Sequence, residues 1–267
     1  MFSSLGVFFK GFAPTMKKGE SVMHRSINVV LVSSLIFLRC SSPTVPRPTT
    51  ADFAVRFDGV SGAIVITSSP ALQLDSLTLE MRVRIDSLQI SNPFLIETGK
   101  NQWNEADGFS SKVEDSALHF RFAEQSNAAV VLGAPFLIQP GVWFHLAYTY
   151  DKDTMKIFVN GTLANQRPET KSIFYGGSGF SLGKASFNTY VGRETVLNGC
   201  LDDVRIWNIV RSPQEIQTAM NQGLAGDEPG LAGYWDFVQF SSDSLAWDKT
   251  ANNNHGTILG NVKFVLP

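Results

Sequence analysis

Three loop segments place aromatic rings beside amide, carboxylate or hydroxyl groups, the combination of side chains that a sugar-binding site needs. Trp103 is followed by Asn104 and Glu105 in a polar stretch where no apolar periodicity predicts burial of the ring. Tyr175 precedes a glycine-rich run, and Tyr190 ends a stretch that contains asparagine and threonine. Exposed rings can pack against the apolar face of a sugar while polar groups orient it. We predict these five residues as candidate ligand contacts, with packing beneath a loop as the alternative for each ring.

Histidine and cysteine are less suitably placed for chemistry. His24, His119, His145 and His255 stand in different segments with no paired spacing and no cysteine companions, so no zinc site is predicted. His145 lies in an aromatic strand pattern and is expected to form local hydrogen bonds. Cys200 lies between a glycine and a leucine with no neighbouring base. It is predicted to be a small buried side chain rather than a nucleophile.

The charge balance excludes a basic surface for nucleic acid. Charged residues make up 17% of the chain, and the net charge is −2. Typical domains carry about 25% charged residues, so the polar surface must consist mainly of uncharged side chains. The chain also has 22 glycines and 20 phenylalanines, with few segments of helical period. Many short strands joined by tight turns are therefore expected, and the predicted fold class is all-β.

Alternation of apolar and polar residues predicts the main strands. The clearest runs are residues 77–85, 141–150 and 198–207. Residues 155–163 predict a hairpin, because the pair Asn160-Gly161 favours a type I′ turn. Residues 53–57 and 63–66 are expected to form a hairpin-like opening.

One short helix is expected near residues 212–222. Ser212 can cap the first turn, Pro213 suits the first helical position, and Glu215 completes a capping box. Gly223 is placed to end the helix in the left-handed conformation.

The first 39 residues predict export from the cytoplasm. A basic start at residues 23–25 is followed by an apolar run at residues 27–38, which is typical of a secretory signal and too short to span a bilayer. Residues 17–20 can be encoded by a ribosome-binding sequence, which predicts Met23 as the true start. The expected location is extracytoplasmic, in the cell envelope.

Cys40 follows this apolar run and begins a tether rich in proline, serine and threonine over residues 40–51. The arrangement resembles a bacterial lipoprotein, in which such a cysteine is lipid-modified at its new N-terminus. The resemblance implies a lipid anchor at Cys40. Arg39 stands where that family normally has a small residue, so cleavage at another position and an uncleaved apolar anchor remain as alternatives.

Seven short motifs carry a wider resemblance over residues 53–265. In order, they are Phe57-Asp58-Gly59, Thr78-Leu79-Glu80, Trp143-Phe144-His145-Leu146-Ala147, Tyr150-Asp151, Val159-Asn160-Gly161, Leu182-Gly183 and Leu201-Asp202-Asp203-Val204-Arg205-Ile206-Trp207. Their types and order are similar to those of LamG-like jelly-roll domains of the concanavalin A-like lectin/glucanase superfamily. The resemblance implies a two-sheet antiparallel jelly-roll sandwich, with residues 52–267 as one domain.

Two C-terminal segments, residues 230–237 and 248–259, look like the pair that often flanks such domains. We expect them to close the sandwich. The strand near residues 257–264 is expected to pair with residues 53–57 and so to cover edges that would otherwise aggregate.

The resemblance does not extend to catalysis. Glycosidases on this scaffold that resemble the family-16 enzymes carry Glu-x-Asp-x-x-Glu on one strand, which positions two carboxylates for a retaining reaction. In this chain Arg82 stands where the acid after Glu80 would be, and Glu114 and Asp115 are adjacent, so a strand would point them to opposite faces. No catalytic residues are predicted, and the chain is not expected to be an enzyme.

Asp58 and Asp202 match the positions at which related sandwiches often hold a structural calcium ion, which makes calcium the candidate cofactor. The residues after Asp58 lack the further acids that the family commonly has there. The alternative is that both aspartates accept hydrogen bonds from turn amides.

The expected function is that of an exported, lipid-anchored and non-catalytic binding module. It would recognise carbohydrate, or an extracellular or envelope protein, through loops at the rim of the sandwich. The alternative is a structural surface protein that mediates assembly, and a glycoside hydrolase on the same scaffold is the more distant reading. No nucleic-acid partner is expected, and contact with the membrane is expected only through the N-terminal anchor.

Overall fold

A computed structural model of the chain describes residues 53–87, 92–98, 107–115, 117–124, 128–135, 139–177, 179–185, 195–238 and 244–267. The chain divides into two compact units between Arg47 and Pro48, and all described residues belong to the second unit. Several predictions lie outside the described residues, namely those for the export segment, Cys40, Trp103, Asn104, Glu105 and Tyr190.

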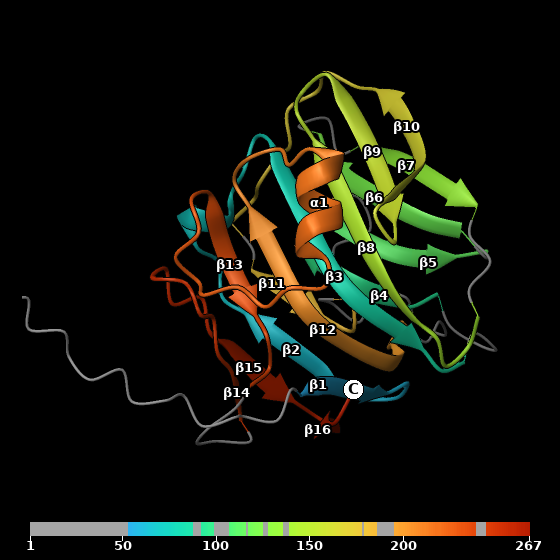
Figure 1. Ribbon diagram of the computed structural model, residues 1–267, viewed down its shortest axis with the longest axis vertical. Coiled ribbons are helices and arrows are strands. Elements are labelled where there is room, and N and C mark those ends of the chain that lie inside the picture. Colours follow the sequence, from blue (N-terminus) through green and yellow to red (C-terminus); the bar gives the residue numbers. More distant parts are fainter. Residues whose placement is uncertain are drawn as a thin grey trace, which may run out of the picture. The chain divides into compact units, whose positions relative to one another are not determined.

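One layer of the domain, here called sheet A, has eight antiparallel strands (Figure 1). Seven follow the order β10-β9-β8-β3-β12-β1-β16, and β13 pairs with β12. Their bounds are β1 (Ala54–Asp58), β3 (Leu77–Ile85), β8 (Trp143–Tyr150), β9 (Thr154–Val159), β10 (Thr162–Pro168), β12 (Asn198–Trp207), β13 (Leu231–Trp235) and β16 (Val262–Val265). The alternating runs predicted from the sequence form β3, β8 and β12, at the centre of this sheet.

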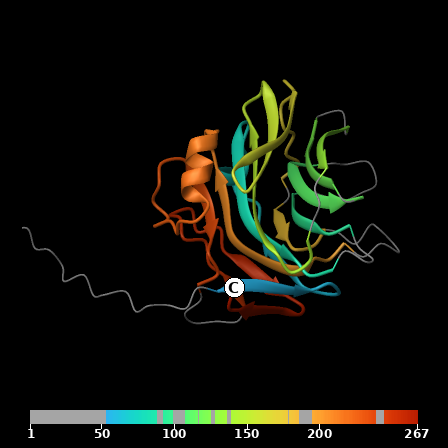
Figure 2. The same cartoon turned by 45° about the vertical axis from the view of Figure 1, so that its right-hand side comes forward.

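The second layer, sheet B, also has eight antiparallel strands, in the order β14-β15-β2-β11-β4-β5-β6-β7. Their bounds are β2 (Ala63–Ile66), β4 (Phe94–Thr98), β5 (Phe109–Glu114), β6 (Ala117–Ala123), β7 (Ala129–Pro135), β11 (Phe180–Leu182), β14 (Leu245–Ala246) and β15 (Gly256–Leu259). Figure 2 shows the two layers from the side. The predicted all-β, two-sheet antiparallel sandwich is therefore confirmed.

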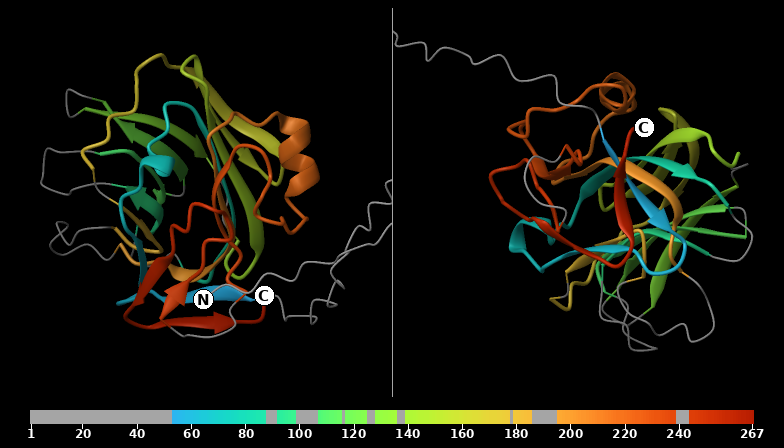
Figure 3. Two further views of the ribbon diagram at one scale, coloured as in Figure 1. Left: turned by 90° about the vertical axis from the view of Figure 1, so that its left-hand side faces the viewer. Right: turned by 90° about the horizontal axis from the view of Figure 1, so that it is seen from below.

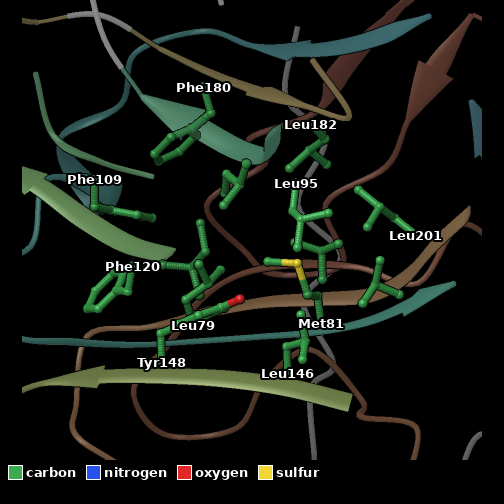
Figure 4. Close-up of a cluster of buried hydrophobic side chains, with 14 of the residues drawn as sticks. Leu79, Met81, Leu95, Phe109, Phe120, Leu146, Tyr148, Phe180, Leu182 and Leu201 are labelled. Atoms are coloured by element: carbon green, nitrogen blue, oxygen red, sulfur yellow. The ribbon is translucent and has the colours of Figure 1, made fainter. Parts of the chain in front are cut away.

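The core lies between the sheets and is rich in aromatic rings. Phe120 of sheet B packs against Tyr148 of sheet A with ring centroids 5.3 Å apart, and Phe109 packs against Phe180 within sheet B at 5.7 Å (Figure 4). The Ser111 hydroxyl donates to the Tyr148 hydroxyl oxygen at 2.7 Å, so this polar group is satisfied inside the core. Burial raises the pKa of Tyr148 above its ordinary value, which keeps the phenol neutral.

Helix α1 (Pro213–Ala219) begins as predicted but ends earlier. Ser212 and Glu215 form the expected capping box. Gly223 is not among the residues with positive φ, so the predicted left-handed stop is wrong. The reason is a tertiary contact, because the Arg205 guanidinium donates to the carbonyl oxygens of Ala219 and Gln222 at 2.9 and 2.6 Å and satisfies the end of the helix. The other helical segment described is a single 3-10 turn, Pro70–Leu72.

The hairpin prediction for residues 155–163 is confirmed. Asn160 and Gly161 have φ values of 48° and 73°, as a type I′ turn requires, and they join β9 to β10. The hairpin-like opening is wrong, because β1 belongs to sheet A and β2 to sheet B. The chain changes sheets there, and Gly59 makes the turn with φ +77°.

The C-terminal strands pair with the opening strands in both sheets, but the single strand expected near residues 257–264 is two strands, and only the second pairs with residues 54–57. β16 pairs with β1, with Phe264 opposite Val55, and β15 pairs with β2, with Ile258 opposite Ile64. Figure 3 shows β16 and β1 side by side at the lower edge of the domain. The β15–β16 corner thus follows the β1–β2 corner from one sheet to the other. Among the helices of the described residues, none is both long and apolar enough to cross a membrane.

Candidate functional site

Helix α1 covers part of the outer face of sheet A (Figure 1). Ile216 of the helix packs against Ala147 of β8 and Phe158 of β9, and all three side chains are buried. This contact explains why β3 is buried on both faces near Thr78 and Glu80, although its sequence alternates. A ligand therefore has no access to this part of sheet A.

Glu80 lies in that covered region, next to Arg211 and His145. Its carboxylate lies 2.9 Å from Arg211 Nη1 and 3.2 Å from His145 Nε2, and its side chain is fully buried. Burial alone would raise the pKa of Glu80, but His145, Arg211 and Arg205 together lower the pKa below its ordinary value. The carboxylate is thus charged, paired and out of reach of a substrate. His145 is a buried strand residue, as predicted. Only its backbone forms the expected local hydrogen bonds, with Asn160, because its two ring nitrogens have no hydrogen-bond partner among the described residues.

Beyond the helix, arginines occupy the outer face of sheet A. The guanidinium groups of Arg82 and Arg84 lie over the Trp143 ring, at 5.2 and 5.3 Å from its centroid. Trp143 is half-buried on this outer face. Cys200 is buried, with Arg84 Nη2 at 3.2 Å from its sulfur. Burial raises the pKa of the thiol above its ordinary value, which fits the predicted inert side chain.

The end of sheet B at which β4 leads into β5 forms a second region, here called the β4 rim. It consists of Thr98, Asp107, Gly108, Phe174 and Tyr175. Gly108 N donates to Phe174 O at 2.6 Å, and Thr98 Oγ1 lies 2.8 Å from Phe109 O. Gly108 has φ +57°, and a Cβ there would lie 2.0 Å from Thr98 Oγ1, so only glycine fits this close approach.

The candidate residue Tyr175 is a packing residue on this rim. Its hydroxyl donates to Leu74 O at 2.9 Å, and its ring packs against the hydrophobic core. Burial raises the pKa of Tyr175 above its ordinary value. The alternative reading, packing under a loop, therefore holds for this ring. The neighbouring Phe174 side chain is 36% exposed and is the accessible aromatic ring of the rim.

The predicted ligand residues that lie outside the described part of the chain fall in two segments, whose flanking residues lie at different places in sheet B. Trp103, Asn104 and Glu105 lie in the segment that joins Thr98 to Asp107, so both ends of that segment are on the β4 rim. Tyr190 lies in the segment that ends at Thr195, whose carbonyl oxygen accepts from Phe94 N at the start of β4. Thr98 and Thr195 therefore lie at opposite ends of β4, about 13 Å apart along the strand.

The two candidate calcium ligands are also held apart. Asp58 lies opposite Asn198, and Asp202 is four residues further along β12, which corresponds to about 13 Å. Asp202 is buried and pairs with Arg82 at 3.0 Å. Among the described residues, no group of three or more His, Cys, Asp and Glu side chains could hold a metal ion. The geometry does not fit one ion shared by Asp58 and Asp202.

Asp58 instead serves a turn, which was the alternative reading. Its Oδ1 accepts from the amides of Val60 and Ser61 at 2.8 and 2.9 Å, and its Oδ2 accepts from Asn261 Nδ2 at 3.0 Å. Burial acts to raise the pKa of Asp58, but these hydrogen bonds outweigh it and lower the pKa to about 2. The carboxylate links the β1–β2 corner to the β15–β16 corner.

One exposed tryptophan was not singled out by the sequence. Trp247 follows β14, and its side chain is 42% exposed. Its ring contacts the His255 ring edge-on, with centroids 4.4 Å apart. The sequence signal was weak, because β14 is only two residues long and its alternation is too short to separate an outward ring from a buried one.

A family comparison agrees with this architecture. Residues 58–217 match the Laminin_G_3 family model, described as concanavalin A-like lectin/glucanases superfamily. The chain belongs to this superfamily. A search of the curated proteins found no match to the sequence.

Solved structures with the superfamily fold share little sequence with this chain. A proposed carbohydrate-binding protein from Bacteroides ovatus superimposes with a TM-score of 0.63 at 19% identity, over 82% of this chain and 61% of that protein, so the chain spans less than two thirds of its length. A SAP-like pentraxin from Limulus polyphemus gives 0.52 at 13% identity, over 81% and 96%. The CBM40 of a Ruminococcus gnavus IT-sialidase gives 0.51 at 15% identity, over 62% and 97%. At these identities the similarity shows the fold alone.

Proposed function

We propose that this chain is a non-catalytic module that binds carbohydrate at the β4 rim of sheet B. The observation that carries the proposal is the position of Thr98 and Asp107, the described residues that flank residues 99–106. Both flanking residues are on the rim, beside the exposed ring of Phe174. The segment contains Trp103, Asn104 and Glu105, an aromatic ring with an amide and a carboxylate.

The environment of the described carboxylates supports binding rather than hydrolysis. A retaining glycosidase needs two carboxyl groups about 5 Å apart that flank the substrate. Glu80 is buried between Arg211 and His145. Glu114 Oε2 lies 2.6 Å from Lys112 Nζ. Neither carboxylate is placed to act with a second acid on a bound sugar.

The superfamily relatives support the same reading. The Bacteroides ovatus protein is described as a proposed carbohydrate-binding protein, and the Ruminococcus gnavus CBM40 has also been solved with α2,3-sialyllactose bound. By analogy, a glycan is the first ligand class to test for this chain.

The test is a glycan array probed with residues 51–267, which contain every strand of the sandwich. We expect binding to at least one glycan, and we expect Trp103→Ala to weaken it about tenfold or more, the loss typical of an aromatic hot spot. Trp143→Ala is the matched control, because Trp143 lies on the outer face of the other sheet. Equal binding by wild-type protein and Trp103→Ala would contradict the assignment of the rim.

The array also tests whether glycan binding depends on the calcium ion that the resemblance implies. Parallel incubations in millimolar calcium and in EDTA should give the same hits, because Asp58 and Asp202 are engaged by other partners. Hits that require calcium would place a metal site elsewhere. A blank array in both conditions would favour a protein partner, or the alternative role in surface assembly.

We further propose that the chain is exported and held in the cell envelope by lipid on Cys40. A signal-like segment, a cysteine at its end and a proline-rich tether support this proposal. Cells that express the full chain with a clickable fatty acid should yield labelled protein in the membrane fraction, and Cys40→Ser should abolish the label. Cys200→Ser should keep the label, because Cys200 is buried in the sandwich. If the wild-type protein carries no label, the lipid proposal is wrong. Cleavage at another position and an uncleaved apolar anchor would then be the two remaining explanations.

A further inference from the structure

The exposed Trp247 and the half-buried His255 lie at the same end of sheet B as the β4 rim. The register shows this directly, because Ala246, Gly256, Ile66, Phe180 and Thr98 stand opposite one another in turn across five neighbouring strands. Thr98 is a rim residue and Ala246 is buried. The residue that follows Ala246, toward that end of the sheet, is Trp247.

Continuing the register by one residue places Trp247, His255 and Thr67 in one row. Trp247 lies opposite His255, in agreement with their ring contact, and His255 lies opposite Thr67. Thr67 is exposed, as is Thr257 in the row behind. Four strand spacings separate β14 from β4, so Trp247 lies about 19 Å from the β4 rim along this end of the sheet.

The chemistry of this row suits a sugar ring. The exposed indole offers an apolar face for the C–H groups of a sugar, and the threonine hydroxyls both donate and accept hydrogen bonds. His255 Nδ1 accepts from Asp248 N at 3.0 Å, so the neutral imidazole carries its proton on Nε2 and can donate to a ligand hydroxyl. An aromatic surface with flanking donors and acceptors is typical of glycan sites rather than of apolar protein contacts.

The backbone beneath the pair is held rigidly. The Asp248 carboxylate accepts from the amides of Tyr234, Thr250 and Asn254 at 3.0, 2.9 and 2.9 Å, and from Thr250 Oγ1 at 2.9 Å. Trp247 immediately precedes this residue, and the edge-on contact with His255 orients its ring. A platform ordered in advance loses little conformational entropy when a ligand binds.

We propose that Trp247, with His255, Thr67 and Thr257, forms a second glycan subsite that binds the far end of an oligosaccharide seated at the β4 rim. The inference rests on the proposed carbohydrate binding and adds the substrate class. The ligand is an extended chain of several sugars, because a mono- or disaccharide cannot span about 19 Å between the two regions.

The experiment measures affinity against chain length by calorimetry. The probes are di- to hexasaccharides of β-1,3-glucan, β-1,4-glucan, xylan and mannan, together with sialyllactose. We expect the affinity of residues 51–267 for one series to rise with length, and Trp247→Ala to remove that rise, with about a tenfold loss for the hexasaccharide. The affinity for the disaccharide should stay unchanged. Trp143→Ala should retain the full length dependence.

Two further variants keep the test decisive. Trp247→Phe retains a smaller ring and should retain part of the length dependence. Thr257→Arg adds a long side chain at an exposed strand position beside Trp247 and His255, and it should weaken binding of the longer oligosaccharides. This variant gives an independent result if Trp247→Ala fails to fold. If affinity rises with oligosaccharide length equally in the wild-type protein, Trp247→Ala, Trp247→Phe and Thr257→Arg, the proposal of a second subsite is wrong and the rim proposal stands. If wild-type protein binds none of these sugars or any glycan on the array, both proposals are overturned.

Discussion

Replacing Glu80 with glutamine is expected to lower the free energy of unfolding at pH 7 by about 3–5 kcal/mol, the cost of removing one partner from a buried ion pair. Glutamine keeps the shape of the side chain but loses its charge. Arg211, at 2.9 Å, and His145, at 3.2 Å, would then face a neutral amide in a buried environment. The segment before helix α1 would lose the ion pair between Arg211 and Glu80 that holds it against sheet A.

The effect of Glu80→Gln should depend on pH. The pKa of Glu80 in the folded protein lies below its ordinary value of 4.5. A lowered folded-state pKa stabilises the protein above the ordinary pKa, and this stabilisation is lost as the pH falls through the folded value. The difference between wild type and variant should therefore be largest at neutral pH and shrink below about pH 4.5.

Urea unfolding at pH 7 and at pH 3.5 measures this difference. Asp75→Asn is the control, because Asp75 forms an exposed ion pair with Lys152 and should contribute little. A variant as stable as the wild type at pH 7 would show that the negative charge of Glu80 beside Arg211 and His145 does not stabilise the fold. A difference that does not shrink between pH 7 and pH 3.5 would show that packing, rather than charge, explains the loss.

Deleting residues 230–267 is expected to make the chain insoluble. The deletion removes β13, β14, β15 and β16, so β1, β2 and β12 each lose a neighbouring strand. It also removes Trp235, which is fully buried in the core. Exposed strand edges beside a broken core are a strong signal for aggregation.

The control for this truncation is the removal of residues 266–267 alone. These two residues lie beyond β16, and Leu266 is 67% exposed, so their loss should leave solubility and melting temperature unchanged. Expression, sedimentation and circular dichroism of both truncations would test the prediction. A soluble and well-folded chain that ends at residue 229 would show that the C-terminal strands are dispensable.

Local signals predicted the elements of the fold well. The alternation of residues 77–85 became β3, the Asn160-Gly161 pair formed its type I′ turn, and Ser212 with Glu215 formed the capping box. Each of these features depends on side-chain and backbone preferences within a few residues. For the same reason, the sequence found where helix α1 begins but not where it ends, because the end depends on Arg205 from another element.

The candidate site was predicted less completely. Residues 99–106 lie outside the described residues, but the residues that flank them, Thr98 and Asp107, are on the β4 rim. The sequence could not show that Tyr175 is packed against the core or that Thr195, which follows the segment with Tyr190, lies at the other end of β4. It also passed over Trp247, whose position beside His255 depends on the pairing of β14 with β15.

The sequence by itself determined the all-β class, the principal strands, the tight turns and the membership suggested by ordered motifs, because these depend on periodicity and on turn chemistry over short distances. Only the tertiary structure decided which strands became neighbours and which polar faces became buried. Asp58 meets Asn261 across some 200 positions of the chain, and Glu80 is buried because α1 covers an otherwise outward strand position. Such contacts form when apolar area is removed from water across the whole domain, and no local pattern encodes them.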